Sequence, residues 1–158
     1  IIPPCHGGVR GSIPRRTAKL WNIMNTLVIG LLILCYALML GIIFAQVLLT
    51  APVVFKVLDN QNASRFLRKI FPRYYIFLLL ISLIALLISF LFFESFDLYS
   101  ALTCVIFAFV GYIIIPLTNS ARDRGWDNLF KWLHNLSVFN TLVIMIVALV
   151  QIFRLTTI

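Results

Sequence analysis

Four long apolar stretches, none of which contains an acidic or basic residue, constrain this chain more than any other feature. They run from about residue 26 to 50, 74 to 93, 98 to 117 and 136 to 153. A helix needs about 20 mostly apolar residues to cross a ~30 Å hydrocarbon core. Membrane β-strands are about 10 residues long and alternate in polarity, whereas these stretches are longer and do not alternate. The sequence therefore predicts an all-α fold, an integral membrane four-helix bundle.

The composition excludes the main soluble classes. Only 11% of the 158 residues are charged, compared with about 25% in ordinary globular proteins. The hydrophobic fraction is 62% and the mean hydropathy is +1.05. Because so few charges cannot cover a water-exposed surface, a cytosolic enzyme, a secreted disulfide scaffold and a disordered chain are excluded. Residues 24–158 are expected to form a single transmembrane domain.

The joints between the apolar stretches differ in length and pattern. Glu94 to Asp97 is short, so spans two and three should be antiparallel neighbours. In the first joint the apolar side chains fall on one helical face and the basic ones on the other, which predicts a short amphipathic helix on the membrane surface. The basic face consists of Arg65, Arg68 and Lys69 and is expected to bind anionic lipid headgroups. In the last joint a helical repeat of apolar residues predicts that the fourth helix begins near Trp126.

The distribution of charge predicts the orientation. The first and third joints carry eight basic residues, namely Lys56, Arg65, Arg68, Lys69, Arg73, Arg122, Arg124 and Lys131. The second joint has no basic residue. The positive-inside rule then places joints one and three in the cytoplasm and both termini outside. The excess of basic residues therefore indicates how the chain is oriented in the membrane and that it contacts anionic lipid. It gives no support to nucleic-acid binding.

The segment 1–23 disagrees with this orientation because it carries four basic residues of its own. It is rich in Pro and Gly, begins with Ile, and is followed by Met24 at the edge of the first apolar stretch. We therefore expect residues 1–23 to be disordered or non-native sequence from upstream of the true start. The alternative is a natural basic tail that is disordered.

The spans carry no ionisable residue of the kind that proton pumps and ion-coupled transporters bury in the bilayer. That transport class is therefore disfavoured, and a chain of this size could transport only as an oligomer or with a partner. The three cysteines, Cys5, Cys35 and Cys104, form no Cys-x-x-Cys or Cys/His cluster. We expect neither a metal site nor a catalytic residue, and no cofactor.

Uncharged polar residues gather in the predicted cytoplasmic half of all four spans. Pro52 and Pro116 each remove a backbone donor and free a carbonyl there. The expected result is a polar pocket that binds a ligand, formed by Gln46, Thr50, Pro52, Tyr74, Tyr75, Asn119, Arg122, His134, Ser137 and Asn140. The alternative is structural: polar residues at span ends lie near water, and those inside a bundle often bond to neighbouring helices.

Small residues at positions 37, 41 and 45 form a stripe along span one. Ala37, Gly41 and Ala45 are four residues apart, a spacing that lets two helices approach closely. This predicts packing inside the bundle, with a dimer contact as the alternative.

Several motifs together resemble a known family. Residues 51–55 (Ala-Pro-Val-Val-Phe) close span one, residues 71–75 (Phe-Pro-Arg-Tyr-Tyr) open span two, and His134 with Ser137 and Asn140 opens span four. This set, with Asn119 and Arg122, resembles the transmembrane protein 205-like family, the domain of unknown function 4149, over roughly residues 31–152. Ser64 departs from that pattern, which would have glycine. The resemblance implies a small four-helix protein of the bacterial inner membrane with no settled activity.

A fainter similarity concerns Lys131, His134 and Ser137. The four-helix membrane protoporphyrinogen oxidases and the copper-resistance D-like proteins carry a similar Lys-x-x-His-x-x-Ser stretch, which would make His134 a haem or porphyrin ligand. Against this, the sequence offers no second histidine for bis-histidine ligation and no intramembrane lysine or arginine for a propionate.

These observations leave three hypotheses for function. The first is a non-catalytic membrane module that binds a lipid, a small molecule or a partner protein in the polar pocket. The second is a haem- or porphyrin-linked oxidoreductase that uses His134. The third is a small transporter subunit that acts as a homo-oligomer or with a membrane partner.

Overall fold

The protein is a bundle of long helices. The computed structural model describes residues 15–93 and 95–157, and within these ranges every regular element is helical. Four helical stretches are long and apolar enough to cross a membrane: Ile23–Val57, Asn60–Phe92, Ser95–Asp123 and Asp127–Thr156. Both the fold class and the number of spans predicted from the sequence are confirmed. The segment 1–14 lies outside the described residues, and the chain is already helical at Arg15.

The first span is built from three consecutive elements. Helix α1 (Arg15–Phe44) continues into a π-helix, η1 (Ala45–Thr50), and then into α2 (Ala51–Val57). In η1 the wider turn joins the N–H of Ala51 to the carbonyl of Gln46, five residues before it. The helix therefore continues for seven residues beyond Thr50, where the apolar stretch ends. The wider turns lie directly before Pro52, which has no N–H, and the helix continues past it.

The second span begins earlier than predicted. Helix α3 (Asn60–Phe92) includes the amphipathic segment 63–71 and passes through Pro72 without a break. The segment is helical, as expected, but it is the first part of the span and not a separate surface helix. The chain reverses before it at Leu58 and Asp59, whose ψ angles of 144° and 160° are extended.

The remaining spans are joined by a tight turn. Helix α4 (Ser95–Asp123) passes through Pro116, and α5 (Asp127–Thr156) begins one residue after Trp126, as predicted. Gly125 has a φ of 68°, a conformation that favours glycine. There the N–H of Trp126 donates to the carbonyl of Ala121 at 2.9 Å, which closes the end of α4 in a Schellman motif.

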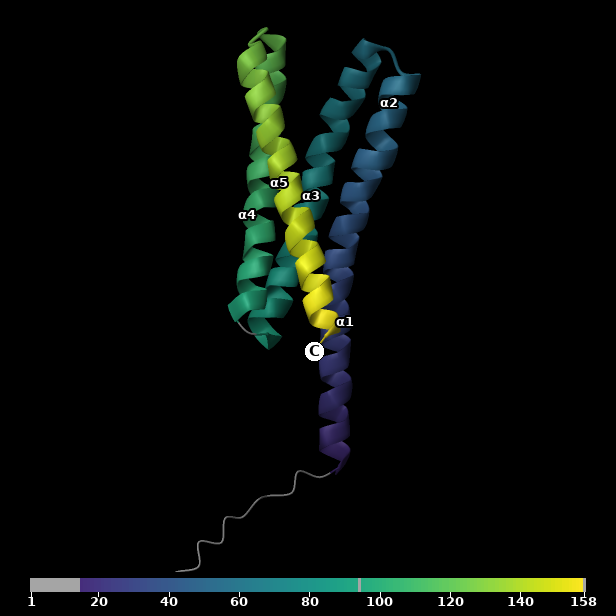
Figure 1. Ribbon diagram of the computed structural model, residues 1–158, viewed down its shortest axis with the longest axis vertical. Helices are drawn as coiled ribbons and strands as arrows, with labels where there is room; N and C mark the ends of the chain where they lie inside the picture. Colours follow the sequence, from purple (N-terminus) through teal and green to yellow (C-terminus); the bar gives the residue numbers. More distant parts are fainter. Residues whose placement is uncertain (1–14, 94, 158) are drawn as a thin grey trace, which may run out of the picture.

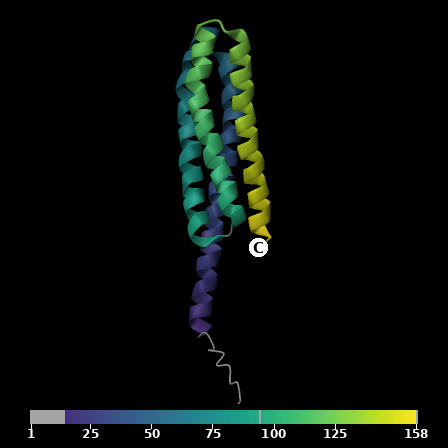
Figure 2. The same cartoon turned by 90° about the vertical axis from the view of Figure 1, so that its left-hand side faces the viewer.

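Helices α3, α4 and α5 follow one another as antiparallel neighbours, and α1 packs against α3 and α5. Figures 1 and 2 show this arrangement, with the N-terminal part of α1 extending beyond the bundle. The middle of the α4 face that points inward carries small residues, namely Ala101, Cys104, Ala108 and Gly111. Small side chains let helices approach closely where lipid provides no hydrophobic driving force.

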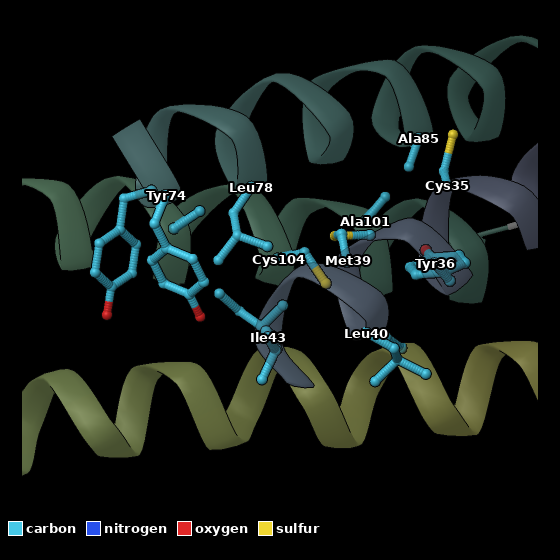
Figure 3. Packing of buried hydrophobic residues seen from close by; sticks show 14 of the residues in the cluster. Cys35, Tyr36, Met39, Leu40, Ile43, Tyr74, Leu78, Ala85, Ala101 and Cys104 are labelled. Atoms are coloured by element: carbon cyan, nitrogen blue, oxygen red, sulfur yellow. The ribbon is translucent and has the colours of Figure 1, made fainter. Parts of the chain in front are cut away.

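Larger side chains of α1 fill the centre of the bundle. Tyr36 and Met39 are fully buried, and Figure 3 shows them beside Ala101 of α4. Ala37 and Gly41, by contrast, are exposed, and a Cβ added at Gly41 would meet no atom within 4 Å. The predicted packing of this small-residue stripe inside the bundle is therefore wrong, because the larger side chains of the opposite α1 face form the contact.

Tyr75 is the contact point of three helices. Its ring packs so tightly on Gly111 of α4 that a Cβ there would lie 2.1 Å from the ring. Its hydroxyl meets the hydroxyl of Ser137 on α5 at 2.9 Å and that of Thr141 at 3.2 Å. The glycine is thus required for a close approach of α3 to α4.

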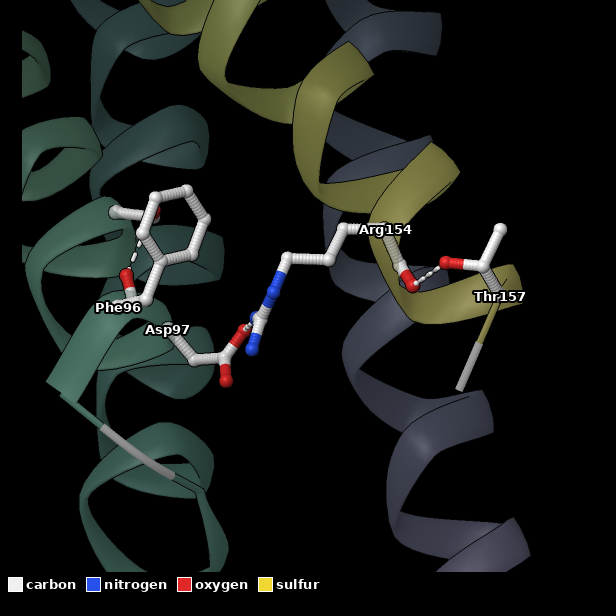
Figure 4. Close-up of polar contacts among 5 residues, drawn as sticks. Phe96, Asp97, Arg154 and Thr157 are labelled. Carbon is white, nitrogen blue, oxygen red and sulfur yellow. Dashed lines mark hydrogen bonds and ion pairs between the residues drawn. The ribbon is translucent and has the colours of Figure 1, made fainter.

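A buried ion pair closes the end of the bundle that holds the α3–α4 connection. Asp97 lies in the first turn of α4 with a side chain that is 2% exposed, and it pairs with Arg154 in the last turn of α5. Figure 4 shows the pair, and the guanidinium also lies 4.8 Å from the centre of the Phe96 ring. An acid at a helix N-terminus and a base at a helix C-terminus both complement the helix dipole.

Gly111→Ala tests the Tyr75 contact. The added methyl group must displace the Tyr75 ring, and overpacking of this kind costs about 1–3 kcal/mol, so the melting temperature in detergent should fall. Gly41→Ala is the control, because open space surrounds Gly41 and alanine favours the helix. Equal melting temperatures for the two variants would contradict the close approach.

Arg154→Gln tests the buried ion pair. It leaves the Asp97 carboxylate buried without a cation, which should lower the free energy of unfolding by about 3 kcal/mol. Adding Asp97→Asn to the Arg154→Gln variant removes the buried charge and should restore much of the lost free energy of unfolding. The measurement is a double-mutant cycle from thermal unfolding followed by circular dichroism. Additive effects of the two substitutions would rule out the coupling.

Candidate functional site

A cavity of about 610 Å³ lies between the helices at the end of the bundle opposite the Asp97–Arg154 pair. We call this the basic end; it comprises residues 51–73 and 116–134. In Figure 1 the helices at this end form two arms, α2 with the start of α3 on one side and the α4–α5 turn on the other. The cavity is lined by residues of both arms, including Phe55 and Leu67 on one side and Asn119 and Phe130 on the other.

Most of the cavity wall is apolar, and its deepest part lies toward the middle of the bundle. Ile43 of α1, Ile115 of α4 and Met145 of α5 line this floor. Tyr75 stands beside them, and its hydroxyl, bonded to Ser137 and Thr141, ties α3 to α5. Phe71, Tyr74 and Tyr75 form edge-to-face ring contacts, with centroid distances of 6.5 and 4.9 Å. The floor is thus an aromatic and aliphatic surface.

Two buried polar groups in the wall have no partner among the described residues. Gln46 is 8% exposed and its Nε2 makes no hydrogen bond; Tyr74 is 6% exposed and its hydroxyl, which lies near the Thr141 side chain, makes none of normal length and geometry. Both residues line the cavity. Gln46 belongs to η1, and π-helical turns occur often at functional sites. A buried donor without a partner costs about 1–3 kcal/mol, so such groups are normally satisfied by protein, water or a ligand.

Basic side chains lie at the mouth of the cavity. Arg68 of α3 spans the mouth and forms a two-armed ion pair with Asp123, the last residue of α4, in which one hydrogen bond measures 2.8 Å. Both groups lie toward the ends of their helices, beyond the apolar stretches 74–93 and 98–117. Arg122 lies over the Phe130 ring at 5.7 Å, and His134 stacks on the same ring at 6.1 Å.

Seven of the ten residues predicted for the polar pocket line this cavity: Gln46, Tyr74, Tyr75, Asn119, Arg122, His134 and Ser137. The other three do not. The hydroxyl of Thr50 donates to the carbonyl of Ala45 in its own helix at 3.2 Å, and Pro52 is exposed on the outer side. Asn140 is 1% exposed but lies in the core of α5 outside the cavity, with its Nδ2 unpaired. A shared end of the bundle therefore does not guarantee a shared face.

The three residues predicted to bind headgroups differ in exposure and in their partners. Arg65 and Lys69 are exposed, whereas Arg68 is partly buried in the cavity wall and is paired with Asp123. The sequence offered no sign of this pair, because the two residues lie 55 positions apart.

The structure also adds lining residues that sequence reasoning missed. They include Ser64, Phe130 and Met145. A signal for Met145 was present, because it lies four residues after Thr141 and eight after Ser137, on the same stripe of α5. Phe130 and Ser64 gave no signal, since each lies in a segment that was read as a joint.

Few groups in the cavity could hold a metal or haem. His134 is the only histidine among residues 15–93 and 95–157, and no group of three His, Cys, Asp or Glu side chains forms a cluster in those ranges. Cys35 and Cys104 are buried free thiols elsewhere in the core. The arrangement is better suited to hydrogen bonding and apolar contact than to metal coordination.

Comparison with known proteins gives one result. Residues 34–127 match the family described as Domain of unknown function (DUF4149). No curated protein and no solved structure matches the chain. The more specific name, transmembrane protein 205-like, stays a prediction. The matched segment includes most of the first span, the whole of α3 and α4, and thus three of the four walls of the cavity. Because the match covers more than half of the sequence, this chain belongs to the DUF4149 family.

Proposed function

We propose that this protein is a non-catalytic membrane module that holds a lipid-like small molecule in the cavity at the basic end. The observation that carries the proposal is the pair of unpartnered polar groups, Gln46 Nε2 and the Tyr74 hydroxyl, buried in the cavity wall. A ligand with one polar group would satisfy them and offset their desolvation cost. The apolar remainder of the wall would contact the apolar part of the same molecule.

The chemistry of the wall supports binding over catalysis. His134 is the one histidine in the lining, and neither a carboxylate nor a thiol accompanies it. The wall therefore lacks the carboxylate or thiol partner that a catalytic histidine commonly has. The haem alternative would rest on His134 alone as a histidine ligand, because it is the only histidine among residues 15–93 and 95–157.

The surroundings of the cavity fit a bacterial inner-membrane protein whose basic end faces the cytoplasm. Exposed Arg65 and Lys69 lie on α3 where anionic headgroups would be expected, and each such residue near a membrane surface contributes about 1 kcal/mol. In this orientation the cavity opens toward the cytoplasmic leaflet. A homo-oligomer or a membrane partner belongs to the same proposal, since the outer helix faces are free for contact.

Ala51→Trp tests whether the cavity is a binding site. Ala51 is half-buried in the cavity wall, so an indole there should fill the space that a ligand needs. Ala37→Trp is the matched control on the same span, because Ala37 is exposed on the outer face. Native mass spectrometry of the full chain, released from a mild detergent, should detect a bound lipid on the wild type and on Ala37→Trp, and at least tenfold less on Ala51→Trp.

Melting temperatures of both variants show whether each is folded. A wild-type protein that carries no bound molecule, or a folded Ala51→Trp that carries as much as the control, would overturn the proposal.

A further inference from the structure

We propose that the ligand of this cavity is a single-chain amphiphile with an anionic head, whose carboxylate or phosphate lies at Arg122 and whose chain extends toward Met145. The inference rests on the proposed function and names its ligand class. It is carried by three independent features of the cavity: the charge at its mouth, the direction of its polarity and its size.

The charge at the mouth is positive and incompletely neutralised. No acidic side chain is among the residues that line the cavity, whereas Arg68, Arg122 and His134 all are. Asp123 neutralises Arg68 through a two-armed pair. Arg122 makes no ion pair within the described part of the chain; it lies over the face of Phe130, 5.7 Å from the ring centre. A guanidinium stacked on a ring keeps its edge N–H donors free, and these match a carboxylate or a phosphate.

The polarity of the cavity changes in one direction along α5. His134 lies near the mouth, Ser137 and Thr141 follow, and Met145 lies at the floor. At a rise of 1.5 Å per residue, the eleven steps from His134 to Met145 span about 16 Å. Along α4 the same change runs from Arg122 and Asn119 to Ile115. An amphiphile with its head at the mouth and its chain toward the floor meets charged residues at one end and apolar residues at the other.

The size of the cavity favours one chain. Its volume of about 610 Å³ lies within the ~300–1,000 Å³ of pockets that hold one small molecule. That volume suits a single acyl chain with its head better than the two chains of a phospholipid. Gln46 Nε2 and the Tyr74 hydroxyl, the unpartnered groups of the wall, line the same cavity.

The experiment uses three probes with the same eighteen-carbon chain. Binding of tritiated oleate to the purified full chain in dodecyl maltoside is measured, and unlabelled lysophosphatidylglycerol and monoolein compete with it. Oleate carries a carboxylate, the lysophospholipid a phosphate, and monoolein no charge. We expect both anionic probes to bind at least tenfold more tightly than monoolein, and their ranking separates a fatty acid from a lysophospholipid as the source of the head.

Arg122→Gln identifies the residue that recognises the head. A hydrogen bond to a charged group contributes about 1.5–3 kcal/mol, which corresponds to a loss of oleate affinity of tenfold or more. Monoolein binding should not change, which shows that the cavity remains intact. The matched control is Arg124→Gln: Arg124 also lies over an aromatic ring, Trp126 at 4.9 Å, but it does not line the cavity. We expect the control to bind oleate like the wild type.

The outcomes separate this inference from the proposed function. If monoolein binds as tightly as oleate, or if Arg122→Gln and Arg124→Gln bind oleate with the same affinity, the placement of an anionic head at Arg122 is wrong. The cavity remains a lipid site in that case. If none of the three probes binds the folded wild type, the proposed lipid-like ligand itself is wrong.

Discussion

The contact of Tyr75 with Gly111 is the constraint on which the rest of the structure depends. At this point α3 and α4 approach so closely that no Cβ fits between them, and the Tyr75 hydroxyl reaches α5 through Ser137 and Thr141. Three helices are thus fixed to one another at a single level. Toward the basic end of this level the helices form the two arms and the cavity; toward the other end they pack around α1 as a continuous core.

The two ends of the bundle are held by ion pairs of different character. The Asp97 side chain is only 2% exposed, and its pair with Arg154 joins the first turn of α4 to the last turn of α5. The Arg68–Asp123 pair at the cavity mouth is 35% and 56% exposed. Exposed pairs contribute little to stability and are screened by salt, whereas breaking a buried pair is costly. The closed end is therefore firmly held, and the mouth of the cavity is joined by a contact that can open at low cost.

The sequence predicted more of the fold than of the site. It placed the four spans, the start of the fourth helix near Trp126 and the antiparallel order. It did not show that the first helix continues through Pro52 or that segment 63–71 is joined to α3. Hydropathy marks where a stretch stops being apolar, not where its helix ends, and in long membrane helices π-helical turns and neighbouring side chains can compensate for the donor that proline lacks. For the candidate site, the sequence indicated the end of the bundle at which the cavity lies, but could not sort Asn140, Thr50 and Pro52 from the residues that line it.

What the sequence determined by itself is the set of properties that depend on length and composition: four helical spans, a membrane as their environment, and basic residues gathered at one end. Only the tertiary structure decided which faces meet. In lipid a span is apolar on all sides, so hydrophobic periodicity does not mark the buried face. The uncharged polar residues Ser82, Ser89, Asn140 and Gln151 do turn inward, but most contacts depend on shape. Small residues show this clearly, since Gly111 is packed under Tyr75 while Gly41 faces open space.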